Sequence, residues 1–465
     1  MRVFLLNPPY KKHFIRSARW TVRSISASNW YPIWLAYACG LLEKEGFKTS
    51  LLDALVDNFN FKETVNMVKD FSPQICVVYS SLESKKNDVE IAGVIKKETG
   101  SLTIFVGPWV SSNPEEFLKE ESVDIAATGE FDETILELAK GIPKEEIKGI
   151  AYKKHGSIIK NPSRDPVSEE RLEDFPFVTD VYSRHLRIRN YRQAPLAHPF
   201  IDLFTGRGCD WGKCSFCLWP HVMNKGFGYR KREMKSVVDE FKYIKKQLPF
   251  VREVFIQDDT LPAYRAKEFS LAILENNIKM AWSSYARVDL DFATLKLMKK
   301  AGCRCLHVGY ESADNQILKQ CAKGITRQMA EEFTYYANKL GFIIHADFIF
   351  GLPGETQETI KDTITWAKKL PLHSYQFTVP HVYPQTSLHV YLARFNFLID
   401  GRIDYPYLSY EELISSAKKA ITTCHFNLRY ILRMLKKPKE FLRALYYSRF
   451  VIKYLLKKDT VWIKK

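Results

Sequence analysis

The stretch TGRGCDWGKCSFC (residues 205–217) places three of the nine cysteines of the chain, Cys209, Cys214 and Cys217, in one short loop. The apolar run PFIDLF before it predicts a strand, so the loop lies where that strand ends. Thiolates are soft ligands suited to iron–sulfur clusters or zinc. Three of them without a fourth nearby fit a [4Fe–4S] cluster whose fourth iron stays open to a substrate. Zinc is the alternative, because His221 could complete a Cys3His site.

Further apolar runs follow the cysteine loop, and helical patterns separate them. The runs cover residues 252–259, 281–287, 305–312, 343–354 and 375–384, and the first helix is expected at 235–247. Strands alternating with helices in this way predict a partial (β/α)6 TIM-like barrel, cut short of eight units. In such barrels the chemistry takes place on the loops at the carboxyl ends of the strands.

A separate alternation precedes the cysteine loop. Strands are expected at residues 2–7, 47–54, 75–81, 102–107 and 124–129, and a helix at 33–45. This pattern predicts an α/β, doubly wound, Rossmann-like sheet with a ligand crevice at the carboxyl ends of its strands. The residues at those ends are mostly small or turn-forming: Asn7, Pro8, Pro9, Ser80, Ser81, Gly107, Pro108, Gly129 and Glu130. They would let backbone approach a bulky ligand closely, although a structural sheet with ordinary turns would show much the same pattern.

These patterns divide the chain into four parts. We expect a Rossmann-like domain at 1–155, a connection at 156–195, the barrel at 196–390 and a basic helical region at 391–465.

The barrel half resembles the radical S-adenosylmethionine (SAM) superfamily, in particular its members with an N-terminal cobalamin-binding domain. The resemblance covers about residues 1–384. It implies that Cys209, Cys214 and Cys217 ligate three irons of a [4Fe–4S] cluster and that SAM chelates the fourth. No side chain is assigned as catalytic, since cluster and SAM generate the radical. The first cysteine gap holds four residues where the commonest spacing has three, which leaves the loop geometry open.

The resemblance also implies a set of SAM contacts at successive strand ends. Phe216 matches an aromatic near the adenine, and the polar residues match contacts to the methionine and ribose. The set is Phe216, Gln257, Asp258, Asp259, Arg287, Glu311 and Ser312, with Ile349 and Gly351 in the fifth-strand motif FIFGLPGET.

In the first domain, the resemblance implies that cobalamin binds at the carboxyl ends of the strands. The expected contacts are Asn7, Ser80, Ser81, Gly107, Pro108, Trp109, Gly129 and Glu130. No Asp-x-His-x-x-Gly motif occurs, and Gly107-Pro108-Trp109-Val110 stands where many relatives read Gly-Gly-x-His. The cobalt would therefore be ligated by another group or by none. Alternatively, the domain has lost cobalamin and serves as scaffold.

Composition limits the class of protein. The 465 residues are 46% hydrophobic and 26% charged, which excludes a disordered chain, and no apolar run reaches the length of a spanning helix. The N-terminus lacks a signal cleavage site, so an intracellular protein is expected. The other six cysteines have apolar neighbours and are expected in the core: Cys39, Cys76, Cys303, Cys305, Cys321 and Cys424.

The net charge of +16 is concentrated at the C-terminus, where residues 426–465 hold twelve basic and two acidic side chains. The pattern over 428–458 predicts an amphipathic helix that lies on an anionic membrane surface. Its basic face would carry Arg443, Arg449, Lys453 and Lys457, and its apolar face Leu442, Leu445, Phe450 and Leu455. The alternatives are a helix packed on the barrel and a nucleic-acid contact.

Three motifs and the basic tail resemble cobalamin-type radical enzymes of hopanoid and other isoprenoid-lipid biosynthesis. The motifs are WYPIWLAY (30–37), CLWP (217–220) and DDT (258–260). This implies hydrogen abstraction from an unactivated carbon of a lipid, followed by cobalamin-assisted methylation or rearrangement. The partners implied are an electron donor such as flavodoxin or ferredoxin and an anionic membrane, so we expect a cytoplasmic enzyme, peripheral at the inner membrane face. The alternatives are a methyltransferase of a soluble natural product or peptide and, in another class, a zinc-stabilised nucleic-acid-binding protein.

Overall fold

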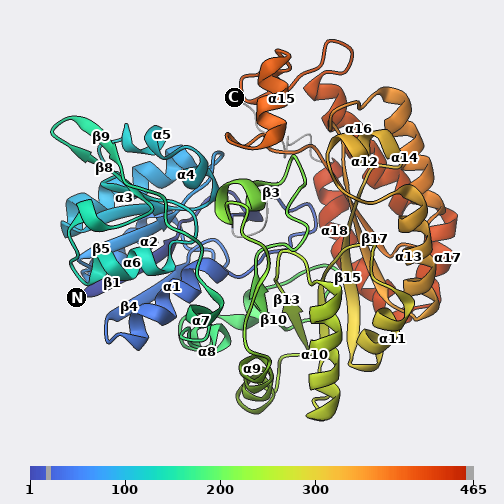
Figure 1. The fold of residues 1–465 in the computed structure, drawn as a ribbon, viewed down its shortest axis with the longest axis horizontal. Helices are drawn as coiled ribbons and strands as arrows, with labels where there is room; N and C mark the ends of the chain where they lie inside the picture. The colour runs from blue at the N-terminus through green and yellow to red at the C-terminus, as the bar shows by residue number, and fades with distance from the viewer. Residues whose placement is uncertain (17–21, 457–465) are drawn as a thin grey trace.

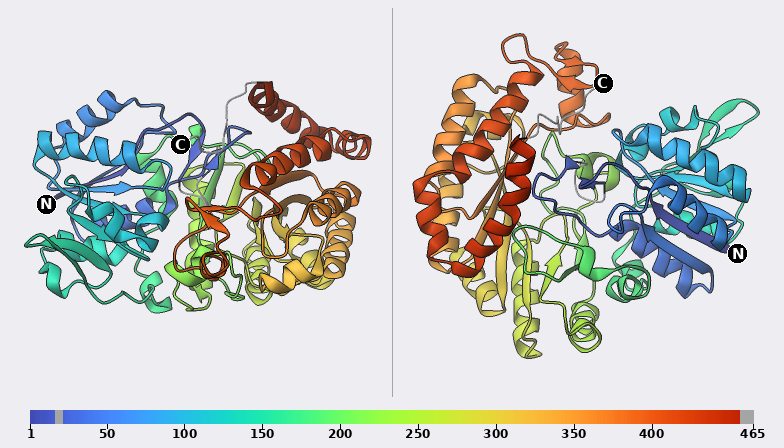
Figure 2. Two further views of the ribbon diagram at one scale, coloured as in Figure 1. Left: turned by 90° about the horizontal axis from the view of Figure 1, so that it is seen from above. Right: turned by 180° about the vertical axis from the view of Figure 1, so that it is seen from behind.

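The computed structural model describes residues 1–16 and 22–456 as two α/β domains followed by a helical C-terminal region (Figure 1). The N-terminal domain lies beside the barrel, and the C-terminal helices cover one side of the barrel (Figures 1 and 2). This is the predicted fold class.

The first domain is built on a seven-stranded sheet of order β4-β1-β5-β6-β7-β8-β9. Five strands are parallel: β1 (Arg2–Asn7), β4 (Lys48–Asp53), β5 (Ile75–Tyr79), β6 (Leu102–Val106) and β7 (Ile125–Ala127). The hairpin β8 (Ile150–Lys154) and β9 (Ser157–Lys160) extends the sheet with antiparallel pairing. The sheet therefore runs to Lys160, five residues past the expected end of the domain at 155.

Helices cover both faces of this sheet because its strands are apolar on both sides. Along β1, Val3 and Leu5 enter one core, and Phe4 and Leu6 enter the other. The first core includes α1 (Ile33–Lys44) and α6 (Asp132–Ala139), and the second includes α2 (Phe61–Phe71) and α3 (Lys85–Thr99).

Helix α1 joins the two domains. Its residues 33–42 are all buried, which explains the long apolar stretch YPIWLAYACGLL. Tyr31, just before the helix, stacks on Tyr191 with ring centroids 3.8 Å apart. Trp34 stacks on Trp219 of the barrel at 5.7 Å. A helix packed on every side needs apolar residues all round, rather than an amphipathic pattern.

The second domain is a six-stranded parallel sheet of order β10-β13-β14-β15-β16-β17, which confirms the predicted partial barrel. Its strands are β10 (Phe200–Leu203), β13 (Glu253–Ile256), β14 (Ala281–Ala286), β15 (Cys303–Glu311), β16 (Ile343–Ile349) and β17 (Ser374–Thr378). The helices between them are α9 (Met234–Gln247), α10 (Ala263–Glu275), α11 (Phe292–Lys300), α12 (Asn315–Gln320), α13 (Arg327–Lys339) and α14 (Gln357–Lys369).

The C-terminal region contains the short hairpin β18 (Leu398–Ile399) and β19 (Arg402–Ile403) and four helices: α15 (Ser387–Arg394), α16 (Tyr410–His425), α17 (Leu428–Leu435) and α18 (Pro438–Leu456). The single helix predicted over 428–458 is wrong, because Pro438 lacks the amide hydrogen that a continuous helix would need and starts a new helix. The tail also packs on the barrel: Tyr430 donates to the carbonyl of His373 at 3.1 Å, and Arg304 contacts Glu440 at 3.0 Å.

Only part of the predicted membrane-facing surface is free of protein contacts. Leu442 is 65% exposed and Leu445 is 50% exposed, whereas Arg443 pairs with Glu440. The side chain of Leu455 and all of Lys457 lie outside the described residues. Among the helices that are described, none has the length and apolar character needed to cross a bilayer.

Candidate active site

The cysteine loop is held by contacts at several points along its length. Its beginning forms the two-residue strand β11 (Gly206–Arg207), which pairs with β12 (Arg230–Lys231). Further along, the indole Nε1 of Trp211 donates to the carbonyl of Ala322 at 2.8 Å, and the amide of Ser215 donates to the carbonyl of Cys321 at 2.9 Å. Gly324 has a φ of +68°, and a Cβ there would lie 2.0 Å from the Trp211 ring. The loop is therefore held closely against the segment that follows α12.

The spacing of the thiols favours a cluster over a single zinc ion. Four ligands around one zinc at Zn–S distances of about 2.3 Å stand about 3.8 Å apart. In the described part of the chain, only Cys39, Glu43 and His185 bring three potential metal-ligand atoms within 4.8 Å of one another. The three loop cysteines are thus spread more widely, as ligands on different irons of a cluster must be.

His221 does not complete a zinc site with the loop cysteines. It lies in η3 (Trp219–Met223), and its Nε2 is 3.2 Å from the carbonyl oxygen of Cys214. The donor set near the loop is therefore three thiols, which fits a [4Fe–4S] cluster with one open iron.

Asp258, at the end of β13, holds the start of the loop rather than pointing to open space. Its carboxylate accepts from the amides of Thr205 (2.6 Å) and Gly206 (3.2 Å) and from the hydroxyl of Tyr229 (2.6 Å). Burial raises the pKa of Asp258, and these hydrogen bonds act in the opposite direction. Ser312 is likewise buried and accepts from the amide of Asp314 at 3.1 Å. We infer that both residues position the backbone around a SAM site.

Other predicted SAM contacts keep polar atoms available. Within the described residues, Gln257 Oε1 and Arg287 Nη2 are buried and have no hydrogen-bond partner. Arg287 also lies over the Trp211 ring at 4.7 Å, which brings the end of β14 to the cysteine loop. Glu311 pairs with Lys323 at 2.6 Å, a partner that its position in the sequence does not reveal. Burial acts to lower the pKa of Lys323, but Glu311 outweighs it and the pKa is raised.

The remaining predicted SAM residues are apolar or glycine. Phe216 and Ile349 are buried, and Gly351 has a φ of +96°, a backbone conformation that favours glycine. Asp259 lies beside Asp258 and accepts from the Asn224 amide at 2.9 Å. Phe216 thus lies within the cysteine loop, and the rest of the set lies at or just after the carboxyl ends of β13–β16.

The cobalamin crevice predicted for the first domain lies at the carboxyl ends of β1, β5, β6 and β7. Gly107 there has a φ of +124°, and a Cβ would lie 2.6 Å from the carbonyl oxygen of Ser80, so only glycine fits. Pro108 and Trp109 begin α4 (Pro108–Ser112) directly after it. The Trp109 ring lies 5.6 Å from that of Tyr383, which belongs to the segment after β17. The crevice therefore faces the barrel.

Most polar side chains of this crevice are already paired within the protein. Asn7 donates to Asp53 at 2.9 Å, Ser80 donates to Asp88 at 2.8 Å, and Ser81 lies 2.8 Å from the hydroxyl of Ser84. The buried Arg16 binds Asp88 at 2.7 Å and ties the segment after β1 to the same network. Gly129 donates its amide to Ser111. This edge therefore offers mainly backbone and shape to a ligand.

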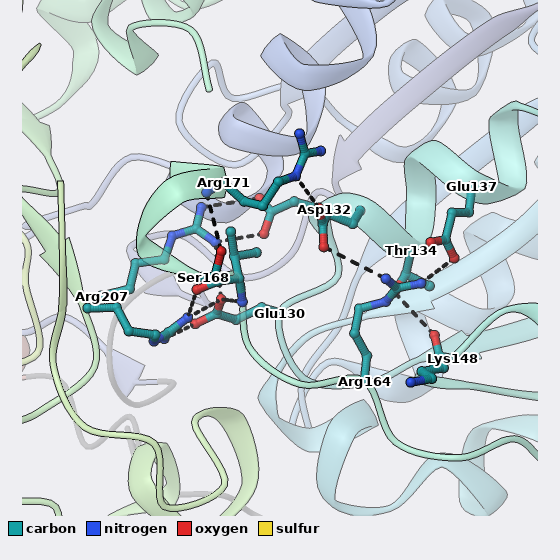
Figure 3. Close-up of polar contacts among 12 residues, drawn as sticks. Glu130, Asp132, Thr134, Glu137, Lys148, Arg164, Ser168, Arg171 and Arg207 are labelled. Atoms are coloured by element: carbon teal, nitrogen blue, oxygen red, sulfur yellow. Dashed lines mark hydrogen bonds and ion pairs between the residues drawn. The ribbon is translucent and has the colours of Figure 1, made fainter. Parts of the chain in front are cut away.

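A buried ionic cluster joins the crevice to the cysteine loop (Figure 3). Arg207, two residues before Cys209, donates to Asp132 at 2.8 Å and lies 3.5 Å from Glu130. Arg230, on the paired strand, binds Glu130 at 2.6 Å. Burial acts to raise the pKa of Glu130, but the two arginines outweigh it and the pKa is lowered.

Aromatic rings surround the Arg207 guanidinium. Together with the ionic cluster they form the contact between the two domains, here called the domain joint. The guanidinium carbon lies 4.7 Å from the Trp34 ring centroid and 4.9 Å from that of Tyr37, both on α1. Such cation–π contacts are stronger when desolvated. Glu130, predicted as a cobalamin contact, therefore has its carboxylate committed to the domain joint. Arg207, Arg230 and Asp132 were not among the predicted site residues, since their contacts join segments that are far apart in the chain.

Comparisons with known proteins agree with this architecture. Residues 203–367 match the Radical SAM superfamily, and residues 20–139 match the B12 binding domain. An uncharacterized methyltransferase of Pyrococcus horikoshii is 27% identical over 86% of this chain and 84% of its own length. The anaerobic magnesium-protoporphyrin IX monomethyl ester cyclase of Rubrivivax gelatinosus is 25% identical over 79% of this chain and 66% of its own.

The fold also matches a solved structure. The radical S-adenosylmethionine methyltransferase TsrM from Kitasatospora setae, with cobalamin and a [4Fe–4S] cluster bound, superposes with a TM-score of 0.67. It is 18% identical and covers 86% of this chain and 78% of its own. At that identity the likeness concerns the fold.

Fold, cysteine loop and domain matches together define a radical SAM enzyme with an N-terminal B12-binding domain. The cofactors that these two domain matches support are a [4Fe–4S] cluster, SAM and cobalamin. The two matches favour an enzyme over a zinc-stabilised nucleic-acid-binding protein, and a cobalamin-binding domain over a scaffold that has lost cobalamin. The names of these proteins mention no hopanoid or isoprenoid lipid, so the lipid substrate stays a prediction.

Proposed function

We propose that this enzyme transfers a methyl group to a carbon atom of a small molecule. When bound, the cluster and SAM supply the one-electron chemistry that removes a hydrogen atom, and cobalamin supplies the methyl group. The observation that carries the proposal is the way in which the two sheet edges face each other. The first domain's crevice meets the barrel through Trp109 and Tyr383, and Arg207 ties it to the cysteine loop. Two relatives that bear the name methyltransferase support the same chemistry.

In this proposal Cys209, Cys214 and Cys217 hold the cluster. Gln257, Arg287 and Glu311 contact the polar parts of SAM, while Phe216, Ile349 and Gly351 line its adenine. Asp258 and Ser312 position the surrounding backbone, for the reasons given above. The residues thus bind and orient the reactants, and their burial excludes water from the reacting carbon.

For cobalamin we propose that Gly107, Ser80, Ser81, Pro108 and Gly129 provide a close-fitting backbone surface. Trp109 would form an apolar wall of the same crevice. Asn7 and Glu130 would act indirectly, since their side chains bind protein partners. No histidine of the strand-end motifs is expected to ligate the cobalt, because these segments contain none.

Isotope labelling tests the reaction class. The reconstituted, cobalamin-loaded enzyme is incubated anaerobically with a reductant, a metabolite extract and SAM that carries a trideuterated methyl group. We expect 5′-deoxyadenosine together with a product that bears the labelled methyl group. A product with an unchanged carbon skeleton would instead indicate rearrangement or ring closure, and would overturn the proposal. A Cys214→Ala variant controls for chemistry that does not depend on the cluster.

One further observation supports the membrane-surface prediction. On α17 and α18, Leu428 is 71% exposed, Leu432 is 52% exposed and Leu442 is 65% exposed. Basic residues such as Arg429 and Lys439 lie on the same helices. We propose that this leucine-rich surface docks on an anionic membrane, where basic residues near the headgroups each contribute about 1 kcal/mol.

A further inference from the structure

A cavity of about 550 Å³ lies between the barrel and the C-terminal helices. On one side it is lined by β15, β16 and β17, and on the other by α18, including Ala444, Ser448 and Val451. Leu445 and Ile452 line it and are 50% and 42% exposed, so its mouth lies along α18. This volume is in the range of pockets that hold small molecules.

Aromatic side chains form the floor of the cavity inside the barrel. Trp30, from the segment before α1, lies 4.8 Å from the Phe255 ring, and Phe255 lies 5.1 Å from Tyr285. Trp30 and Tyr285 both line the cavity. An apolar floor of this kind binds by burying apolar area and gives little selectivity for charged groups.

Many polar side chains also line this space, and the described residues leave three of their buried atoms without a hydrogen-bond partner: His373 Nε2, Tyr375 Oη and His307 Nε2. His307 is buried, and among the described residues its Nε2 has no hydrogen-bond partner. Its ring lies 4.7 Å from that of His345, which is 2.7 Å from the Ser374 hydroxyl through Nδ1 and 3.5 Å from Asp347 through Nε2. All four residues line the cavity. Burial lowers the pKa of His307 well below its usual value, so the ring is neutral and hydrogen-bonds without charge.

The charged residues at the cavity are largely paired. Glu440 binds Arg304 at 3.0 Å and also binds Arg443 at 2.6 Å. Asp347 lies beside His345 as described. A strongly charged occupant would therefore lose hydration without finding a free counter-charge.

The cavity also reaches towards the predicted SAM site. Asp347 and Ile349 lie two residues apart on β16, on the same face of the strand. At about 3.3 Å per residue, a group near Asp347 is about 7 Å along the strand from the residue expected to line the adenine. A molecule in the cavity can thus present a carbon atom to the cofactors.

We propose that this cavity is the substrate pocket and that it takes an uncharged, largely apolar small molecule with one hydrogen-bonding group, such as a hydroxyl, directed at His307. The inference rests on the proposed function, which requires a carbon substrate beside SAM. It adds the chemical class of that substrate and the residue that recognises its polar group.

Two fluorescent probes that differ by one hydroxyl test the pocket, pyrene and 1-hydroxypyrene, each titrated into the reconstituted full-length enzyme. We expect both to bind, with 1-hydroxypyrene about fivefold tighter because it can hydrogen-bond to His307. Ala444→Trp fills the cavity and should weaken both probes at least tenfold. The matched control is Leu442→Trp, on the same helix but outside the cavity lining, which should leave both affinities unchanged.

A third variant tests the polar group. His307→Phe should keep pyrene binding and lose the preference for 1-hydroxypyrene. Cluster absorbance and thermal unfolding establish that each variant is folded. Three results would each overturn the assignment. They are wild-type probe affinity in Ala444→Trp, an equal loss of probe affinity in Leu442→Trp, and a retained preference for 1-hydroxypyrene over pyrene in His307→Phe.

Probe binding needs no turnover, so the two proposals fail separately. If the labelled methyl group never appears in a product while Ala444→Trp still loses the probes, the pocket stands and the reaction class is wrong. If Ala444→Trp forms the labelled product at the wild-type rate, methyl transfer stands and the pocket assignment is wrong.

Discussion

The two sheet edges that face each other are built for different kinds of ligand. The barrel edge carries three thiols and polar atoms that are buried without a partner among the described residues, such as Gln257 Oε1 and Arg287 Nη2. At the edge of the first domain, the side chains of Asn7 and Ser80 hydrogen-bond to neighbouring residues of the protein. Gly107, which has no side chain, lets a ligand approach the backbone closely. We expect the first edge to bind its ligands through side chains and the second to bind its ligand through shape. The effects of substitutions should differ accordingly.

The largest expected effect is at the barrel edge. Cys214→Ala should remove the broad absorbance near about 400 nm of the reconstituted cluster and all SAM cleavage, because a cluster ligand has no substitute. Cys321→Ala is the control, since Cys321 is a fully buried thiol in the neighbouring segment. It should keep both signals. Iron analysis and 5′-deoxyadenosine formation measure the outcome, and loss of the cluster in Cys321→Ala alone would contradict the ligand assignment.

The joint between the edges should show the next largest effect. Arg207→Gln leaves the buried Asp132 without its partner, and breaking a buried ion pair costs about 3–5 kcal/mol. We expect a lower midpoint of thermal unfolding and a loss of methyl transfer that exceeds the loss of uncoupled SAM cleavage. Arg164→Gln is the matched control, because Arg164 is more exposed and pairs with Glu137 within the first domain (Figure 3). Equal effects of the two variants would argue against the joint.

In the crevice of the first domain, cobalamin binding should depend on the shape of the backbone surface alone. Gly107→Ala introduces a Cβ that would clash with the Ser80 carbonyl oxygen, and it should reduce cobalamin retention while the cluster still forms. Gly100→Ala is the control: its φ is +68°, but nothing lies within 4 Å of the added Cβ. It therefore carries only the backbone penalty of about 1–2 kcal/mol. Cobalamin absorbance after desalting distinguishes the two variants.

The smallest effect is expected at the exposed leucines of α17. Leu428→Ser with Leu432→Ser should weaken binding to anionic vesicles several-fold, since each leucine contributes up to about 2 kcal/mol when fully buried. Added salt should weaken wild-type binding without abolishing it, because screening acts on the charges alone. Activity on a soluble substrate should not change. Wild-type protein that does not sediment with anionic vesicles would rule out the membrane surface.

The difference between the edges also explains what could be predicted from the sequence. Thiol ligands are visible as residue types at short spacing, so the loop of Cys209, Cys214 and Cys217 pointed to its cofactor. Strand alternation located the strand ends of both sheets. A binding surface formed by backbone atoms, such as the one expected at Gly107, leaves only a weak signal in a single sequence.

Interactions between distant segments could not be predicted in the same way. Arg207 and Asp132 are 75 positions apart, and nothing in the sequence around either residue indicates that the two form a pair. Asp258 was placed correctly at a strand end, but its carboxylate turns to the protein, which residue type alone does not determine. By contrast, the helix break at Pro438 follows from the missing amide hydrogen of proline and was readable in the sequence.

We infer that both edges open onto one reaction space. The most direct measurement is the electron paramagnetic resonance signal of cob(II)alamin in enzyme that also carries the reduced, paramagnetic cluster. We predict faster relaxation and dipolar broadening of that signal in the wild type, their absence in Cys214→Ala, and a weaker effect in Arg207→Gln. A cob(II)alamin signal that is unchanged by cluster reduction in doubly loaded wild-type enzyme would contradict the account.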